Sequence, residues 1–289
     1  MTKLLILGSN GFIGRSLKEF FLKIKKFKLL TPTKDELNLE NQILTIDYLK
    51  LKKPDIILHA ASTFKVNDHS VERNVKLFFN VLAGRNYYGK LIYFGSGAEY
   101  NKDFYVPLMK ENFFRNYSDK TYELSKYICG KEIENCNYKN IFNLRLFSIY
   151  GSYEEYLLRP IANNICRVFS GLPILINRDI NIDYLFIDDF CELLLKFIEK
   201  KSYNFKTYNL CSGKPVRLTK LMNILKKEMN VKTDLMVQKA GEKKEYSGDP
   251  SRFFNEVGKI KFTPYKEAIK KMIFFFEKQF SNSDKYRIF

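Results

Sequence analysis

The sequence predicts an α/β fold in which a doubly wound parallel sheet carries helices on both faces. Short runs that are almost wholly apolar alternate with longer segments of helical periodicity through the first half of the chain. Strands without a polar face are typical of a parallel sheet that is buried on both sides. A glycine-rich turn between the first apolar run and the first helical segment is a third indication.

The expected elements follow this alternation. Strands are expected at Lys3–Leu7, Lys28–Thr31, Asp55–His59, Lys90–Phe94, Ile141–Leu146 and, later, Thr207–Leu210. Helices are expected at Ile13–Ile24, Ser70–Leu82, Thr121–Cys136 and, in the second half, at about Pro160–Phe169, Leu218–Met229 and Pro264–Phe280. The change of rhythm after Tyr150-Gly151 indicates a second, smaller α/β lobe.

Size and composition limit the classes of protein that the chain can represent. With 289 residues, 45% of them hydrophobic, it can bury a sizeable core. Its apolar runs are far shorter than the about 20 residues that span a bilayer, and the first run is too short for a signal peptide. The five cysteines form no CxxC pair, so neither a disulfide framework nor a metal site is expected. We expect a cytoplasmic protein without membrane insertion.

The net charge of +17 comes from lysines that are scattered over the expected helix faces. Scatter of this kind favours a solvated surface over a nucleic-acid site, which would gather its cations in one tract. No nucleic acid is therefore expected as a partner. A basic surface would still favour a doubly anionic substrate such as a nucleoside diphosphate.

Three glycines, Gly8, Gly11 and Gly14, join the first strand to the first helix. In this setting they permit a tight turn and a close backbone approach, so that a pyrophosphate can lie at the helix N-terminus. The pattern predicts a Rossmann-type dinucleotide site. Its expected contacts in this loop are Gly8, Asn10, Gly11, Phe12, Ile13 and Gly14.

The end of the second strand bears on the choice of cofactor. An acid there would bind the 2′-hydroxyl of NAD, whereas NADP needs a residue that accommodates its phosphate. The stretch 30–34 has no acid at the strand tip. Thr33 and Lys34, with Arg15 on the first helix, are placed to face a 2′-phosphate. We therefore expect NADPH, with NADH or NAD as the alternative.

Motifs along nearly the whole chain carry a family resemblance. They are Gly8-x-x-Gly11-x-x-Gly14, Lys34 to Leu39, Lys53-Pro54-Asp55, His59-Ala60-Ala61, Tyr122-x-x-x-Lys126, Leu144-Arg145 with Tyr150-Gly151, Asp183 to Asp189, and Tyr208 to Gly213. On these residues the chain resembles the extended short-chain dehydrogenase/reductases (the NAD-dependent epimerase/dehydratase family) in their nucleotide-sugar branch. The stretch from Lys34 is similar to one in GDP-L-fucose synthases and dTDP-4-dehydrorhamnose reductases. Ser148 and Ile182 depart from the family pattern, which has Asn and Arg there.

The resemblance implies further cofactor contacts and a domain organisation. The additional cofactor residues are Asn38, Leu39, Ala60, Ala61, Ser62, Tyr122 and Lys126. Residues 1–151, joined by about 183–210, are expected to form the dinucleotide-binding domain, and residues 152–289 mainly a nucleotide-sugar-binding lobe. A homodimer is implied as well.

Tyr122 and Lys126 lie four residues apart, on one face of an expected helix. A free tyrosine titrates near about 10 and is a poor acid or base at neutral pH. The Lys126 ammonium and the positive charge of an oxidised nicotinamide would stabilise phenolate and lower that pKa. The resemblance implies that Lys126 also holds the nicotinamide ribose and that Ser96 hydrogen-bonds the reacting oxygen. Ser96, Tyr122 and Lys126 are the expected catalytic residues.

The residues that follow Ser96 discriminate among reactions. Where the family's 4,6-dehydratases place an acid pair, this chain has Gly97 and Ala98, and Glu99 should point to the other face of an extended segment. GDP-L-fucose synthases have a Cys at the position of Ala98 and a His after the Tyr-Gly motif, and residues 150–165 contain no His. We expect NADPH-dependent reduction of the C4 keto group of a GDP-, dTDP- or CDP-linked 4-keto sugar. The reaction would proceed without C3/C5 epimerisation and serve surface polysaccharide precursor synthesis.

Two alternatives remain open. A nucleotide-sugar 4-epimerase needs the same Ser, Tyr and Lys, together with tightly held NAD. A noncatalytic NADP-binding protein of this fold is a different class, against which the intact catalytic set speaks. In either enzyme, arginines suit the substrate diphosphate because the planar guanidinium donates two hydrogen bonds. The expected substrate-binding residues are Ala98, Asn163, Arg217 and Arg252.

Overall fold

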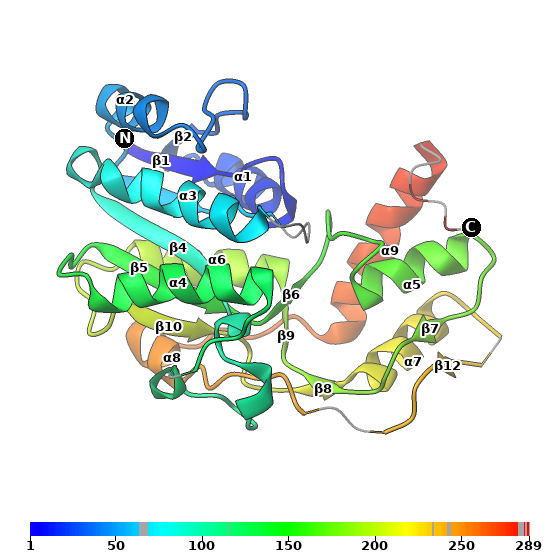
Figure 1. Cartoon of the computed structure of the whole chain (residues 1–289). Helices are drawn as coiled ribbons and strands as arrows, with labels where there is room; N and C mark the ends of the chain where they lie inside the picture. Colours follow the sequence, from blue (N-terminus) through cyan, green and yellow to red (C-terminus); the bar gives the residue numbers. More distant parts are fainter. Residues whose placement is uncertain are drawn as a thin grey trace.

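A six-stranded parallel sheet forms the centre of the larger part of the molecule (Figure 1). The computed structural model describes residues 1–63, 69–114, 116–232, 234–241, 244–282, 286 and 288. The strands are β1 (Thr2–Leu7), β2 (Phe27–Leu30), β3 (Ile56–His59), β4 (Lys90–Ser96), β5 (Ile141–Leu146) and β10 (Thr207–Leu210). They lie in the order β10-β5-β4-β3-β1-β2, and each neighbouring pair is parallel. This confirms the predicted doubly wound sheet.

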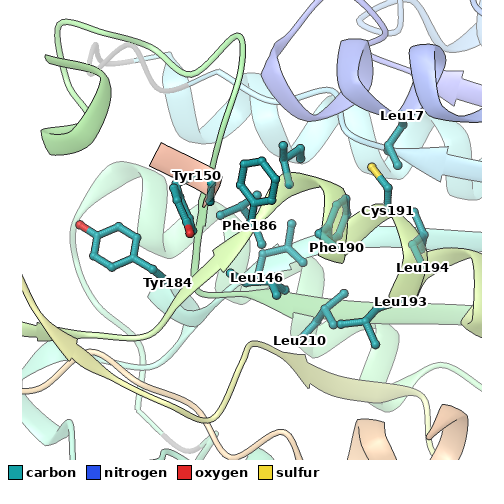
Figure 2. Packing of buried hydrophobic residues seen from close by; sticks show 14 of the residues in the cluster. Leu17, Leu146, Tyr150, Tyr184, Phe186, Phe190, Cys191, Leu193, Leu194 and Leu210 are labelled. Atoms are coloured by element: carbon teal, nitrogen blue, oxygen red, sulfur yellow. The ribbon is translucent and has the colours of Figure 1, made fainter. Parts of the chain in front are cut away.

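Helices cover both faces of this sheet. They are α1 (Phe12–Ile24) and α6 (Ile187–Ile198) on one face, and α2 (Gln42–Lys52), α3 (Ser70–Ala83) and α4 (Thr121–Asn135) on the other. Alternate residues of β1 enter different cores: Leu4 packs in the core of α1 and α6, and Leu5 in that of α2 to α4. Figure 2 shows Leu17 of α1 in the first core with Cys191 and Leu194 of α6.

A smaller part stands at the end of the sheet toward which β1 points (Figure 1). Its helices are α5 (Pro160–Phe169), α7 (Leu218–Glu228) and α9 (Tyr265–Asn282). Its short strand pairs are β7 (Leu175–Ile176) with β12 (Met236–Val237), and β8 (Asn181–Ile182) with β11 (Val216–Arg217). The parallel pair β6 (Ser148–Tyr150) and β9 (Tyr184–Phe186) connects the two parts.

The expected elements are confirmed to within two residues at their ends, and α6, β10 and α8 (Ser251–Val257) return to the sheet. Neither α2 nor α8 was expected from the sequence. Within the described residues, no helix is long and apolar enough to cross a membrane, and no group of His, Cys, Asp and Glu side chains could hold a metal ion. The five cysteines are free.

The segment 246–249 crosses from the smaller part to the sheet. The backbone N–H of Tyr246 donates to Asn181, and its carbonyl accepts from Asp183. Further along the segment, the Ser247 carbonyl accepts from the Met109 N–H, and the Asp249 N–H donates to the Met109 carbonyl. The segment is thereby held from both sides.

Candidate active site

Ser96, Tyr122 and Lys126 come together at the carboxyl end of β4. Ser96 is the last residue of that strand, and the other two lie one turn apart on α4. The Ser96 hydroxyl faces Tyr122 and, as a hydrogen-bond donor to the phenolate, lowers the pKa of that phenol. The Lys126 ammonium donates to the carbonyl of Phe94 at 2.7 Å and lies 5.8 Å from the centre of the Tyr122 ring. The geometry therefore gathers the three residues that we expected to be catalytic.

Burial governs the protonation of this group. It raises the pKa of Tyr122 to about 12, although the hydrogen bond from Ser96 and the charge of Arg159 act in the opposite direction. Burial also lowers the pKa of Lys126 to about 8. Near pH 7, Tyr122 is thus a protonated hydrogen-bond donor and Lys126 is still mostly a cation. These are the protonation states that reduction of a carbonyl requires.

Glu99 is not available as an acid in this site. Gly97–Glu99 forms a 3₁₀ turn, η2, instead of the extended segment assumed from the sequence. The fully buried Glu99 carboxylate accepts from the Ser96 backbone N–H at 3.0 Å and from Arg145 Nε at 2.7 Å. The Ser96 hydroxyl in turn accepts from the Ala98 N–H at 3.1 Å, so Ser96 and Glu99 cap the turn reciprocally.

The glycine loop is shaped for close approach of backbone and ligand. Gly8 has φ of +80°, and a Cβ there would lie 2.7 Å from the backbone of Ala61. A Cβ on Gly14 would lie 2.2 Å from the Gly8 carbonyl oxygen. No acid occupies the first turn of α1, whose N-terminus is therefore open to an anion. The buried hydroxyls of Ser9 and Ser62 have no hydrogen-bond partner among the described residues, and both flank this loop. Orphaned hydroxyls of this kind fit a polar ligand, so the site suits a dinucleotide.

The other expected cofactor residues surround the loop. Ala60 and Ala61 follow β3, and the Ala60 N–H donates to the Leu7 carbonyl of β1. The Leu39 carbonyl accepts from the Asn80 amide at 2.8 Å, which fixes the chain after β2. The remaining expected contacts lie in the same region: Asn10, Gly11, Phe12 and Ile13 at the start of α1, and Asn38 next to Leu39.

The tip of β2 carries charges of both signs. The Thr33 N–H donates to the Glu36 carboxylate at 2.7 Å, which lowers the pKa of Glu36. An ionised acid, Glu36, therefore lies beside the tip of β2, although residues 30–34 at that tip include no acid. Lys34 is 67% exposed and 3.6 Å from the Glu40 carboxylate. The Arg15 guanidinium stacks on the Tyr153 ring at 4.3 Å, so it is engaged with the segment after Gly151.

Sequence reasoning missed Asn74 of α3. Its side-chain amide is bonded to both backbone groups of Thr63 at 2.8 and 3.0 Å. The same amide donates to the Ser125 hydroxyl, which donates to the Tyr122 carbonyl at 2.7 Å. A buried chain of hydrogen bonds therefore joins the loop after β3 to the catalytic helix. An asparagine within the apolar pattern of α3 was the available signal.

Arg159, directly before α5, also escaped sequence reasoning. Its positive charge lowers the pKa of both Tyr122 and Tyr246. It acts on Glu154 as well, whose pKa burial raises to about 8. One carboxylate oxygen of Glu154 is buried and finds no hydrogen-bond partner in the part of the chain that the structure describes.

The expected substrate residues are spread over the molecule. Ala98 lies in the site, next to Ser96, and Asn163 lies partly buried on α5. Arg217 is 3.1 Å from the Asp179 carboxylate and borders an open depression of about 600 Å³, whose lining includes none of the three catalytic residues. Arg252 donates to the carbonyl of Thr207 at the amino end of β10, so it is not gathered with Ser96 at the opposite end of the sheet.

Residues 4–211 match the model of the NAD dependent epimerase/dehydratase family. The chain belongs to this family. The expected family, fold and NAD(P) dependence are thereby confirmed.

Relatives agree with this assignment. GDP-6-deoxy-D-talose 4-dehydrogenase of Aggregatibacter actinomycetemcomitans is 23% identical, over 93% of this chain and 96% of that protein. GDP-L-fucose synthase of Azorhizobium caulinodans is 23% identical, over 77% of this chain and 79% of that protein. RMD from Pseudomonas aeruginosa, solved with NADPH, has a TM-score of 0.81 and 20% identity, over 96% of this chain and 100% of that chain. Other solved structures with this fold hold NAD.

Proposed function

We propose that the protein uses NADPH to reduce the C4 keto group of a nucleotide-diphosphate-linked 4-keto sugar, without epimerisation at C3 or C5. One observation carries the proposal. The residues for hydride transfer form a complete set: Ser96, Tyr122 and Lys126. Glu99, the acid nearest to Ser96 in the sequence, is held in a buried ion pair with Arg145.

Each residue has a separate role in this reaction. The bound nicotinamide supplies the hydride that the C4 carbon accepts. Tyr122, protonated at neutral pH, donates its proton to the C4 oxygen. Ser96 donates a hydrogen bond to the same oxygen as negative charge develops there. The Lys126 ammonium stabilises the phenolate that Tyr122 leaves behind.

The turn after Ser96 supports reduction without further proton transfers. Gly97 has no side chain and the Ala98 methyl cannot carry a proton, so neither can remove hydrogen from C3 or C5. Glu154 is a second buried carboxyl in the region of Arg159. Incorporation of solvent deuterium at C3 or C5 by the wild type, but not by the Glu154→Gln variant, would contradict the proposal and identify an epimerising enzyme.

A GDP-linked sugar is the first substrate to test, because both relatives described above are named for GDP-sugars. We place the diphosphate toward Arg217, whose side chain is 52% exposed, with Asn163 as a further contact. Lys220 and Lys227 line the same depression as Arg217 and add positive charge. dTDP- and CDP-linked sugars remain in the test panel. We do not include Arg252 in this site.

The 4-epimerase alternative is favoured by one observation, the Glu36 carboxylate at the tip of β2. An acid there suits NAD, which such an epimerase holds tightly. The exposed Lys34 ammonium favours NADPH instead. A reductase consumes one NADPH per sugar, whereas an epimerase is redox-neutral.

The decisive experiment incubates the purified protein with GDP-, dTDP-, UDP- and CDP-linked 4-keto sugars and NADPH or NADH. Stoichiometric cofactor oxidation with formation of a 4-hydroxy sugar supports the proposal. If a 4-hydroxy nucleotide sugar supplied in a parallel incubation is instead converted into its epimer, with no net cofactor change, the proposal is contradicted. We further propose that the protein is a cytoplasmic homodimer in surface polysaccharide precursor synthesis. Sedimentation equilibrium tests the dimer, and loss of the product sugar from cell-surface polysaccharide in a deletion strain tests the role.

A further inference from the structure

A second tyrosine reaches the catalytic serine from the smaller part of the molecule. Tyr246 belongs to the segment 246–249, and its phenol lies against Gly97, the residue after Ser96. A Cβ on Gly97 would be 2.7 Å from the Tyr246 hydroxyl oxygen. The missing side chain of Gly97 therefore makes room for this phenol.

Tyr246 is held in place through its backbone and its ring. Its N–H donates to the Asn181 carbonyl and its own carbonyl accepts from Asp183, both at 2.9 Å. Its ring packs between Tyr105 and Phe147, with centroid separations of 5.5 and 5.2 Å. The phenol hydroxyl is thus delivered to one place beside Ser96.

Hydrogen-bond capacity limits what the Ser96 hydroxyl can do. A serine hydroxyl has one hydrogen and two lone pairs. One lone pair accepts from the Ala98 N–H at 3.1 Å. Both phenols, Tyr122 and Tyr246, face this hydroxyl, which lowers the pKa of each. Because the hydroxyl has a single hydrogen, it can donate to only one phenol at a time, and its second lone pair is left for the other.

We propose that Tyr246 is a positioning residue, whose phenol donates to the second lone pair of Ser96 and directs the only Ser96 hydrogen toward Tyr122 and the substrate oxygen. With both lone pairs occupied, the Ser96 hydroxyl can only donate a hydrogen bond to Tyr122 or to the substrate oxygen. The inference rests on the proposed function, in which this hydrogen stabilises the developing alkoxide.

The surroundings of Tyr246 keep it a donor. Burial raises its pKa, and the neighbouring Tyr122 and Cys211 act in the same direction. Arg159 and the hydrogen bond to Ser96 act the other way without reversing the shift. The Tyr246 phenol therefore keeps its proton wherever Tyr122 is a working acid.

The test is a double-mutant cycle on kcat. Tyr246→Phe keeps the ring packing and removes the hydroxyl, so we expect kcat to fall about five- to thirtyfold, as for one lost hydrogen bond in the transition state, with KM for NADPH unchanged. In a Ser96→Ala background the same change should have no further effect. Tyr265→Phe, which removes a hydroxyl that donates to the Lys214 carbonyl, is the matched control. An unchanged kcat in Tyr246→Phe, or an equal loss in the Ser96→Ala background, overturns the inference.

A second measurement separates this inference from the proposed reaction. The titration of Tyr122 can be followed by tyrosinate absorbance with oxidised cofactor bound. The absorbance of the Tyr122→Phe variant is subtracted from that of the wild type, which leaves the contribution of Tyr122. In a Tyr246→Phe background the pKa of Tyr122 should rise, because its phenolate loses the directed hydrogen of Ser96. An unchanged Tyr122 titration overturns the inference. If wild type reduces no sugar of the panel while this titration shifts as expected, only the proposed function fails.

Discussion

Arg145 and Glu99 form a fully enclosed ion pair next to Ser96, the serine to which we assign a catalytic role. The Arg145 Nε lies 2.7 Å from a Glu99 carboxylate oxygen, and both side chains are wholly inaccessible to solvent. The same carboxylate accepts from the Ser96 N–H, so the pair fixes the backbone that carries the serine hydroxyl. A buried pair is costly to break, because the remaining partner is left as an uncompensated charge.

Removing the negative partner should therefore destabilise the fold. We expect Glu99→Gln to lower the free energy of unfolding by about 3–5 kcal/mol, since the Arg145 guanidinium loses the carboxylate at 2.7 Å and keeps that of Glu134 at 3.2 Å. Urea denaturation followed by circular dichroism measures the change. Glu72→Gln, which removes half of an exposed pair with Lys76, is the control and should leave the midpoint nearly unchanged. Equal denaturation midpoints for the two variants would show that the buried ion pair contributes no more to stability than the exposed one.

Tyr122→Phe should abolish reduction while sparing the cofactor site. Loss of a general acid slows the chemical step by roughly 10²–10⁴-fold. The phenyl ring keeps the packing of α4, so NADPH affinity, measured by cofactor fluorescence, should stay within a factor of about two. Tyr127→Phe, five residues further along α4, controls for loss of a hydroxyl from this helix. Residual turnover of Tyr122→Phe near the wild-type rate would rule out Tyr122 as the acid.

The rate of reduction should decline as the pH rises through about 8. Burial lowers the pKa of Lys126 to about 8, so its ammonium is lost there, while Tyr122, with a pKa of about 12, stays protonated. Below the pKa of Lys126 both groups have their active forms, and the profile should be level. Steady-state kcat from pH 5 to 10 checks this. Lys126→Arg keeps its charge, so its slower reaction should show no decline near pH 8; a decline that persists would point to another group.

Two side chains at the tip of β2 should set the cofactor preference. Glu36→Gln removes a negative charge beside Thr33 and should raise the kcat/KM ratio of NADPH over NADH several-fold. Lys34→Ala removes the exposed cation and should lower the ratio by a similar factor. Initial rates with both cofactors give the ratios. If both variants keep the wild-type ratio, the 2′-phosphate is read elsewhere.

Gly8→Ala and Gly171→Ala separate steric contact from backbone strain. Both glycines have positive φ, +80° and +73°, but an added Cβ meets the Ala61 backbone at 2.7 Å only in the first. Gly171→Ala should cost about 1–2 kcal/mol of stability from the left-handed conformation alone and retain NADPH binding. Gly8→Ala should cost more and lose cofactor binding. Thermal denaturation with and without NADPH measures both effects, and a ligand-induced stabilisation that survives in Gly8→Ala would contradict the assigned loop.

The parts of the site that the sequence predicts are those defined by local spacing. Gly8 to Gly14 form one turn, and Tyr122 and Lys126 lie on one helix face, so each pattern is complete within a few residues. Helix α2 escaped prediction because Ile43, Leu44 and Leu51 are exposed, which leaves no apolar stripe of helical period. The Glu36 carboxylate was missed since it folds back onto Thr33 after the strand has ended.

Contacts between segments that are far apart in the sequence cannot be predicted from local spacing. Tyr246 lies near Ser96 although 150 positions of sequence separate them, and no local sequence pattern around either residue predicts this proximity. Arg159 lowers the pKa of Tyr122 although 37 positions of sequence separate the two residues. Both residues come from the smaller part of the molecule, whose approach to the sheet is set by tertiary packing.

The segment 246–249 has a mechanical consequence. Its hydrogen bonds to Asn181 and Asp183 on one side and to Met109 on the other join the two parts of the molecule next to the catalytic serine. Any hinge motion of the two parts must pivot at this seam or break it. Tyr246 lies in this seam, so it should keep its place beside Ser96 when the two parts move relative to each other.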